Sequence, residues 1–250
     1  VLKESGVLRK SGHEHLNGSI TVPIFDVKGN VVEMYGRKIR NNLTAGTAYH
    51  LYLPGPHAGI WNLDGLKNQT EIILCESLID AMTFWVHGFK NVTTSYGTAG
   101  FTDEHLQAFK TLGVERVLIA YDRDGAGNHA AEQLSMALRK DNIESFRILF
   151  PKGMDANEYA LNMKPSGKAL EMVIRKAEWL CVGDTKLCVA PERDLKALEA
   201  EKPQETKTTP AKPEKNEKSS STRTKTAAKG KKYESLEYSG IDALIEDAEQ

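Results

Sequence analysis

The sequence predicts an α/β protein with a mostly parallel sheet and helices on both faces of it. Between residues 71 and 150, short segments that are apolar throughout alternate with segments that have helical spacing. Strands that are apolar throughout are typical of parallel sheets that are covered on both sides. Upstream of this region, residues 20–40 have the pattern of a β-hairpin, and downstream of it the chain becomes rich in Lys and poor in large apolar residues.

The N-terminal elements are two strands. Residues 20–25 and 31–40 are predicted strands, and residues 26–30 join them through Gly29-Asn30, a pair that favours a tight hairpin turn. A loop rich in Gly and Pro at residues 53–57 ends this part of the chain.

The central elements alternate in type. Predicted strands cover residues 71–75, 92–95, 116–121 and 145–150, and predicted helices cover residues 78–87, 102–112 and 126–140. Gly88 ends the first helix, and Thr102 is a good N-cap for the second. Right-handed crossovers between parallel strands place their C-terminal ends on one edge of the sheet, where ligands bind in this fold class.

The last fifty residues divide into two segments of opposite charge. Residues 201–232 are a predicted disordered linker, because Lys202 to Lys232 hold ten basic residues against three Glu and no large apolar side chain. Residues 233–250 have six acidic residues and no Lys or Arg, and their apolar residues are spaced to form a short amphipathic helix.

The overall composition excludes several classes of protein. The 250 residues are 40% hydrophobic and carry a net charge of −1, which excludes a histone-like basic protein and a wholly disordered acidic chain. No apolar run approaches the roughly 20 residues that span a bilayer, so we expect no membrane association and a cytoplasmic location. Three Cys are too few for a disulfide framework. Because the chain opens on Val1, we expect a fragment or an alternative start codon.

Carboxylates follow three of the predicted strands. Glu76 comes directly after the first, with Asp80 one helical turn later; Asp122 and Asp124 come after the third strand, and Asp155 after the last. We call these five side chains the acid cluster, because the shared strand edge should bring them together. Hard oxygen ligands of this kind suit Mg²⁺ or Mn²⁺. A single Asp after a strand is more often a helix N-cap, so the prediction depends on the acids taken together.

The same segments resemble the Toprim domain, which is shared by DnaG-type primases, topoisomerases and some nucleases. The matching segments are residues 72–76 (IILCE) with Asp80, 95–99 (SYGTA), 121–127 (YDRDGAG) and 149–155 (LFPKGMD). The second and third of these resemble bacterial primases more than topoisomerases. Residues 22–29 and 34–38 also resemble the small N-terminal subdomain of a primase core, so that the resemblance covers roughly residues 1–165.

The resemblance implies a division of the chain into domains. We expect a primase-core-like α+β subdomain at residues 1–65, a Toprim domain at 70–165 and a helical extension at 166–200. The disordered Lys-rich linker at 201–232 and the acidic tail at 233–250 follow these.

The resemblance also implies a function. It is that of a DNA primase-type nucleotidyltransferase, which uses Mg²⁺ (or Mn²⁺) to synthesise short RNA primers from ribonucleoside triphosphates on single-stranded DNA during replication. The implied catalytic residues are Glu76, Asp122 and Asp124, and the implied metal ligands are these three with Asp80 and Asp155. Arg37, Lys38 and Lys152 are the implied contacts to nucleic acid or nucleotide. The acidic tail would dock on a replicative helicase or a single-strand-binding protein.

Some residues depart from the family pattern. Ser77 follows Glu76 where the family usually has Gly, and Asp155-Ala-Asn157 stands where the family has Asp-Pro-Asp. Cys181 and Cys188 lack paired Cys-x-x-Cys spacing, so the zinc-binding domain that precedes primase cores is not recognised here.

These departures leave other functions open. The same metal site would serve a Toprim nuclease or a topoisomerase-type strand cleaver, and a non-catalytic nucleic-acid-binding module of a mobile element is a third reading. The basic residues of the second strand have a structural alternative too, since charge protects a solvated edge strand from aggregation.

Overall fold

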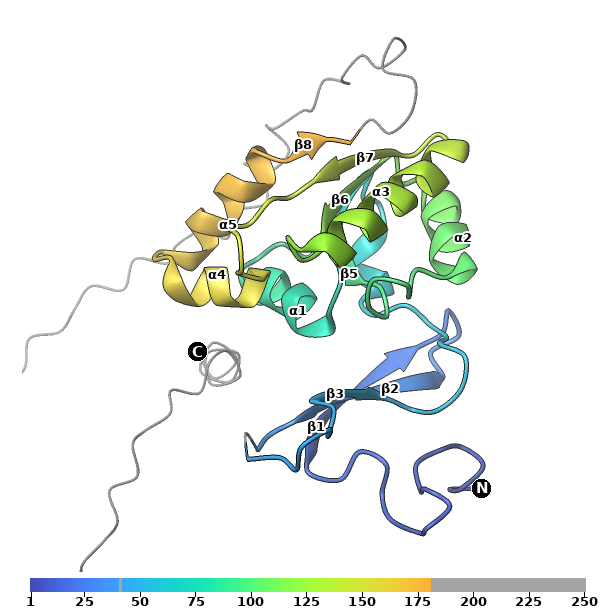
Figure 1. The fold of residues 1–250 in the computed structure, drawn as a ribbon. Helices are drawn as coiled ribbons and strands as arrows, with labels where there is room; N and C mark the ends of the chain where they lie inside the picture. Colours follow the sequence, from blue (N-terminus) through green and yellow to red (C-terminus); the bar gives the residue numbers. More distant parts are fainter. Residues whose placement is uncertain (41, 181–250) are drawn as a thin grey trace, which may run out of the picture.

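The larger of two sheets confirms the predicted parallel arrangement. The computed structural model of the chain describes residues 1–40 and 42–180. The strands of this sheet are β4 (Glu71–Cys75), β5 (Val92–Thr94), β6 (Arg116–Ala120), β7 (Glu144–Arg147) and β8 (Glu178–Trp179). Their order is β5-β4-β6-β7-β8 (Figure 1), and all neighbours are parallel except β7 and β8.

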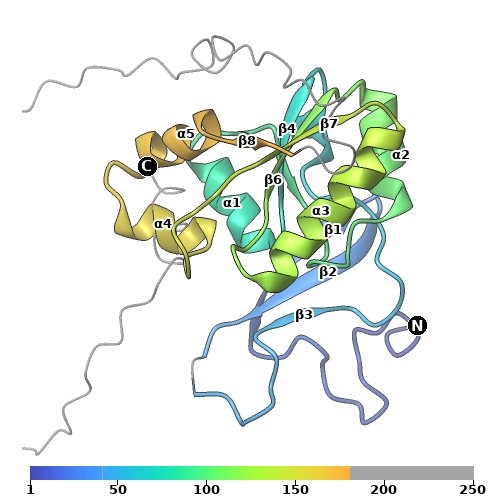
Figure 2. The same ribbon diagram turned by 45° about the horizontal axis from the view of Figure 1, so that its top comes forward.

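Helices cover both faces of this sheet, as Figure 2 shows. They are α1 (Leu78–Val86), α2 (Asp103–Leu112), α3 (Gly125–Lys140), α4 (Ala156–Asn162) and α5 (Ser166–Arg175). In β4, Ile72 and Leu74 pack with side chains of α2 and α3, whereas Ile73 and Cys75 pack with α1, α4 and α5. Successive strand residues point to opposite faces, so a strand covered on both sides is apolar at every position.

Short polar side chains begin the helices at the C-terminal edge of this sheet. Ser77 caps α1, Asp124 caps α3 and Asp155 caps α4, each by accepting a backbone N–H of the first turn. Thr102 caps α2, as predicted, and forms a capping box with His105. Three of these helix N-termini are therefore capped by side chains that lie in or beside the predicted site.

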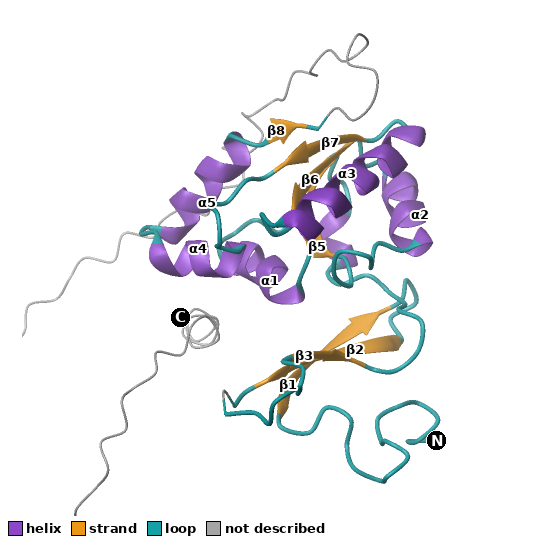
Figure 3. Cartoon of the chain, viewed as in Figure 1, coloured by secondary structure: helices purple, strands orange, loops and turns teal. Residues whose placement is uncertain are grey.

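The smaller sheet is antiparallel and consists of β1 (Ser19–Phe25), β2 (Val31–Lys38) and β3 (His50–Tyr52), in that order (Figure 3). In the turn between β1 and β2, Asp26 Oδ1 accepts the backbone N–H groups of Lys28 and Asn30, and Gly29 has a φ of 82°. Apart from the 3₁₀ helix η1 (Leu63–Leu66), the described part of residues 1–65 contains no helix. The helical component predicted for this α+β subdomain is thus not found there.

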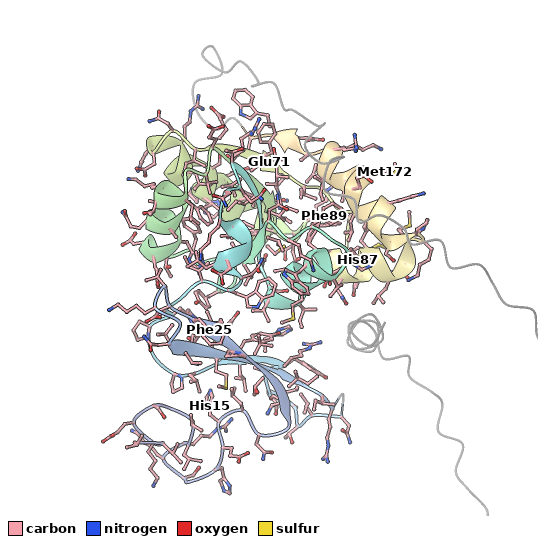
Figure 4. All side chains as sticks on the ribbon, turned by 180° about the vertical axis from the view of Figure 1, so that it is seen from behind. His15, Phe25, Glu71, His87, Phe89 and Met172 are labelled. Atoms are coloured by element: carbon pink, nitrogen blue, oxygen red, sulfur yellow. The ribbon has the colours of Figure 1, made fainter. Side chains whose placement is uncertain are left out.

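The smaller sheet packs against the larger domain at the start of α1. Ile24 of β1, Tyr35 of β2 and Leu78 of α1 form one buried cluster. Tyr96 Oη donates to the carbonyl oxygens of residues 58 and 59, and the Gly59 N–H donates to Glu104 Oε2 at 2.7 Å. Seen from behind, Phe25 marks the smaller sheet and Glu71 the far end of β4 in the larger domain (Figure 4).

Four short elements were not predicted from the sequence: β3, η1, α4 and β8. Residues 166–180 form α5 and β8, and β8 adds an antiparallel strand to the edge of the large sheet. The rest of the predicted extension, the linker and the acidic tail lie outside the described residues. Among residues 1–40 and 42–180, no helix combines the length and the apolarity that crossing a bilayer requires.

Candidate metal and nucleotide site

Two acids of the cluster lie side by side at the C-terminal edge of the large sheet. The register pairs Cys75 of β4 with Ala120 of β6, so Glu76 and Asp122 follow neighbouring strand ends. The backbone N–H of Asp122 donates to Glu76 Oε2 at 3.3 Å. Residues 46 positions apart therefore share one point on the edge of the sheet.

The surroundings of these two carboxyl groups disfavour their charged forms. Burial, and next the charge of Asp122, raise the pKa of Glu76. Burial, followed by the charges of Asp155 and Asp124, raises the pKa of Asp122. Crowded, partly buried carboxylates of this kind are stabilised by a cation that enters between them.

Asp80 lies deeper than the other acids. Its side chain is 4% exposed, and burial, followed by the charge of Asp155, raises its pKa. Ser77 Oγ donates to Asp80 Oδ2 at 2.6 Å, and the backbone N–H of Asn157 donates to Oδ1 at 3.2 Å. Ser77 and Asn157, two of the residues that depart from the family pattern, thus contact Asp80. The Asn157 side chain turns away from it and donates to Thr83 Oγ1 at 2.9 Å.

Asp124 and Asp155 cap helices in this structure. Asp124 Oδ1 accepts the Gly127 N–H at 2.7 Å, and Asp155 Oδ1 accepts the Glu158 N–H at 2.7 Å. Within residues 1–40 and 42–180, no group of three or more His, Cys, Asp or Glu side chains is arranged to hold a metal ion. The five acids therefore gather at one edge of the sheet without forming a complete set of protein ligands.

The donor atoms of Glu76 and Asp122 nevertheless fit a hard divalent cation. Mg²⁺ prefers oxygen ligands and is usually held by one or two carboxylates together with waters and substrate phosphates. A pair of carboxylates at the edge of a sheet meets that requirement, whereas a closed cage of protein ligands is typical of structural sites.

Arg147 of β7 is a charged residue of this site that the sequence analysis missed. Its side chain is 6% exposed, and its Nη2 donates to the backbone oxygen of Asp122 at 2.8 Å. The charge of Arg147 opposes the rise in the pKa values of Glu76 and Asp122. A basic residue inside the apolar run 145–150 was the available signal, because a buried Arg needs a polar partner.

Of the predicted basic contacts, Arg37 lies in a polar network on the smaller sheet. Arg37 Nη1 donates to His50 Nε2 at 2.6 Å, which leaves His50 Nδ1 as the donor to Tyr35 Oη, also at 2.6 Å. Burial, then the charge of Arg37, lower the pKa of His50, and the charge of Asp155 opposes this. The charge of Asp155 in the acid cluster therefore affects the pKa of His50 in this network. His50 was not predicted from the sequence to be part of the network.

Lys38 and Lys152 are placed differently. Lys38 donates to the backbone oxygen of Asn17 and, with Arg9 and His13, lines a pocket of about 370 Å³. Strand alternation puts it on the face opposite Arg37. Lys152 is exposed in the loop that leads to Asp155.

A second pocket, of about 490 Å³, opens beside the β6 strand end. Thr98 and Phe101 line it from the 95–101 segment, Tyr121 lines it from just after β6, and Ala126 and His129 line it from the start of α3. Tyr121 Oη donates to Ser95 Oγ at 2.9 Å, which ties this segment to the strand that precedes Asp122.

The part of the chain that carries the acids matches a known family. Residues 73–160 match the model of the Toprim-like family. The DNA primase of Chlamydia pneumoniae is 28% identical over 159 residues, which are 59% of this chain and 26% of that protein. The DNA primase of Helicobacter pylori strain 26695 is 28% identical over 177 residues, which are 64% of this chain and 30% of that protein. The chain thus spans less than a third of the length of these relatives.

Solved structures have the same fold. The zinc-binding and RNA polymerase domains of the Aquifex aeolicus primase match with a TM-score of 0.58 and 21% identity, over 67% of this chain and 42% of that one. A DnaG primase catalytic domain bound to single-stranded DNA matches with a TM-score of 0.58 and 24% identity, over 71% of this chain and 58% of that one. Residues 73–160 therefore match a Toprim-like domain, and the chain is similar in sequence to bacterial DNA primases and in fold to the DnaG catalytic core.

Proposed function

We propose that this chain is the catalytic part of a DNA primase-type nucleotidyltransferase, an RNA polymerase that makes short primers on single-stranded DNA during replication. The observation that carries the proposal is the contact between Glu76 and Asp122 at the C-terminal edge of a Toprim-like sheet. The similarity of the chain to proteins named DNA primase supports this function over that of a nuclease or a non-catalytic module.

The proposed cofactor is a divalent cation, Mg²⁺ or Mn²⁺, held by the carboxylates of Glu76 and Asp122. When bound, such an ion stabilises negative charge on phosphoryl oxygens and lowers the pKa of an attacking hydroxyl. Asp124 adds a charge from the same loop, and Asp155 and Asp80, which both interact with Asp122, add to the negative potential that attracts the ion. Glu76, whose pKa is raised, is also suited to accept a proton from the hydroxyl group.

The proposed substrates are ribonucleoside triphosphates and a single-stranded DNA template. Arg37 has a guanidinium that can meet a phosphate, and His50 fixes its direction. Lys152 stands in the exposed loop before Asp155, and Lys38 faces the other side of the smaller sheet. That a similar DnaG catalytic domain has been solved with single-stranded DNA supports this template. The acidic segment 233–250, outside the described residues, is the proposed contact to a helicase or single-strand-binding protein.

Primer synthesis is the direct test. The parent protein and the variants Asp122→Asn and Glu76→Gln are incubated with single-stranded DNA, labelled ribonucleotides and Mg²⁺ or Mn²⁺. We expect oligoribonucleotides from the parent and a loss of at least about 100-fold in each variant, because each loses a charge at the reacting centre. Glu132→Gln is the matched control, since Glu132 is an exposed acid on α3.

Two other outcomes would contradict the proposal. Shortened DNA without oligoribonucleotides would identify a nuclease. Binding of single-stranded DNA without synthesis or cleavage by the parent would identify a non-catalytic module.

A further inference from the structure

Arg147 occupies a position where the fold calls for an apolar residue. Its neighbours Phe146 and Ile148 pack on the face of the sheet that α1, α4 and α5 cover. Arg147 therefore points to the other face, beneath α3, together with Ser145, whose Oγ donates to Ser135 Oγ of α3 at 2.6 Å. Only 6% of Arg147 is exposed, so a full positive charge lies under the first turn of α3.

The guanidinium group joins three segments that meet at the site. Nη1 donates to the backbone oxygen of Ile119 in β6 at 3.2 Å. Nη2 donates to the backbone oxygen of Asp122 at 2.8 Å and to Asn128 Oδ1 of α3 at 3.3 Å. These contacts connect the end of the strand, the loop that carries Asp122 and Asp124, and the helix that follows the loop.

All three of these acceptors are uncharged. Within the described residues, Arg147 has no ion pair with a carboxylate inside 4 Å. Burying an Arg without such a partner is costly, and a buried charge that persists usually has another role. What compensates the charge here is the negative potential of Glu76 and Asp122, which both act on Arg147 through space.

We propose that Arg147 is a positioning residue for the divalent cation. By donating to the oxygens of Ile119 and Asp122 at the same time, it sets the backbone of the acid-bearing loop, so that the Asp122 N–H reaches Glu76 Oε2 and the two acids stay adjacent. The inference rests on the cation site of the proposed function. It assigns that site a basic residue from within β7, in addition to the acid that follows this strand.

The two possible roles of Arg147, as a positioning group and as a positive charge, predict opposite effects of its removal on metal affinity. As a charge, Arg147 repels a cation, so its removal by itself would tighten metal binding. As a positioning group, its removal would weaken binding, because outer contacts that orient metal ligands contribute about 10- to 100-fold to affinity. The direction of the change therefore separates the two roles.

The test is calorimetric titration of the full chain with Mn²⁺ and Mg²⁺, without template or nucleotides. We expect Arg147→Met to weaken binding by at least about 10-fold although it removes a repulsive charge. Arg147→Lys keeps the charge but lacks the planar fork that reaches two carbonyl oxygens, so we expect it to weaken binding as well. The Lys variant also keeps the test decisive if the Met variant does not fold.

Ser145→Ala is the matched control. It removes another buried hydrogen bond between β7 and α3 on the same face, but it touches neither Asp122 nor its loop. We expect it to lower thermal stability and to leave metal affinity unchanged. Unchanged or tighter binding in both Arg147 variants would overturn the inference, and so would an equal loss in Ser145→Ala or a parent protein that binds neither ion. Primer synthesis by the parent, assayed separately, reports on the proposed function rather than on Arg147.

Discussion

Buried polar side chains at the strand ends differ in what satisfies them. Asp80 is held by Ser77 and by a backbone N–H, whereas Glu76 accepts the backbone N–H of Asp122, and burial followed by the charge of Asp122 raises its pKa. His105, which is fully buried, accepts the Thr102 N–H at Nδ1 and donates from Nε2 to the Thr94 oxygen at 3.1 Å. Asp80 and His105, whose polar atoms have hydrogen-bond partners, are typical of structural groups. Glu76 and Asp122 are typical of a ligand-binding site.

The burial of His105 predicts a pH dependence of stability. Burial lowers the pKa of His105 to about 4. Because the unfolded chain takes up this proton near the ordinary pKa of about 6.5, the free energy of unfolding falls as the pH drops from 6.5 towards 4. At pH 5 we expect His105 to account for a loss of about 2 kcal/mol relative to pH 7.

Urea unfolding at pH 7 and pH 5 measures this effect in the parent and in His105→Gln. The raised pKa values of Glu76, Asp80 and Asp122 act in the opposite sense, and both proteins share them. The informative quantity is thus the difference between the two proteins. An equal change in both would show that His105 does not titrate as proposed.

Helix starts and acid-bearing loops coincide in this fold. Asp124 and Asp155 each begin a helix and each belong to the acid cluster, so a single side chain can stabilise the fold and hold a ligand. The helix dipole favours both roles, since the N-terminus of a helix attracts negative charge. Capping and metal binding must therefore be separated by substitutions that change one and not the other.

Asp124→Asn and Asp124→Ala separate them. Asn is as good an N-cap as Asp, so we expect Asp124→Asn to keep the stability of the parent and Asp124→Ala to lose about 1 kcal/mol in urea unfolding. If Asp124 contributes its charge to the cation, both variants should lower Mn²⁺ affinity to a similar extent in calorimetric titration. An Asn variant with the affinity of the parent would make Asp124 a cap alone.

Helices and strands with a clear hydrophobic periodicity could be predicted from the sequence, whereas very short helices and strands could not. The strand at Glu71–Cys75 was predicted with its observed bounds, and the Thr102 cap was identified from its residue type. The helix Ala156–Asn162 has seven residues, which is too short for a period to show, and Glu178–Trp179 is a strand only because it pairs with β7. The strand predicted at residues 145–150 is shorter in the structure, where β7 ends at Arg147.

Leu78 of α1 joins the smaller sheet to the larger domain in a small buried cluster. Leu78, the first residue of α1, is fully buried between Ile24 and Tyr35 of the smaller sheet and lies two residues after Glu76. We therefore expect this contact to couple the position of the basic residues on β2 to the strand end that carries the acids.

Leu78→Ala should loosen this contact. We expect a loss of about 2–4 kcal/mol in the free energy of unfolding, since the substitution leaves a cavity in a fully buried site. Hydrogen exchange should rise in β1 to β3 more than in β4. Leu170→Ala, at a fully buried position of α5 in the other core cluster, is the control that should lower stability without faster exchange in the smaller sheet. Equal protection of the smaller sheet in both variants would argue against the coupling.

The amino-acid sequence alone determined the parallel sheet and the edge at which its acids would lie, because alternating apolar strands and helices allow few other arrangements. Its motifs alone also determined the resemblance to Toprim proteins. Only the tertiary structure decided how each acid is used: Asp124 and Asp155 as caps, Asp80 as a buried acceptor, and Glu76 beside Asp122. It alone also revealed Arg147, His50 and the docking of the smaller sheet. Periodicity is a local property of the chain, whereas burial and hydrogen-bond partners depend on residues that are distant in sequence.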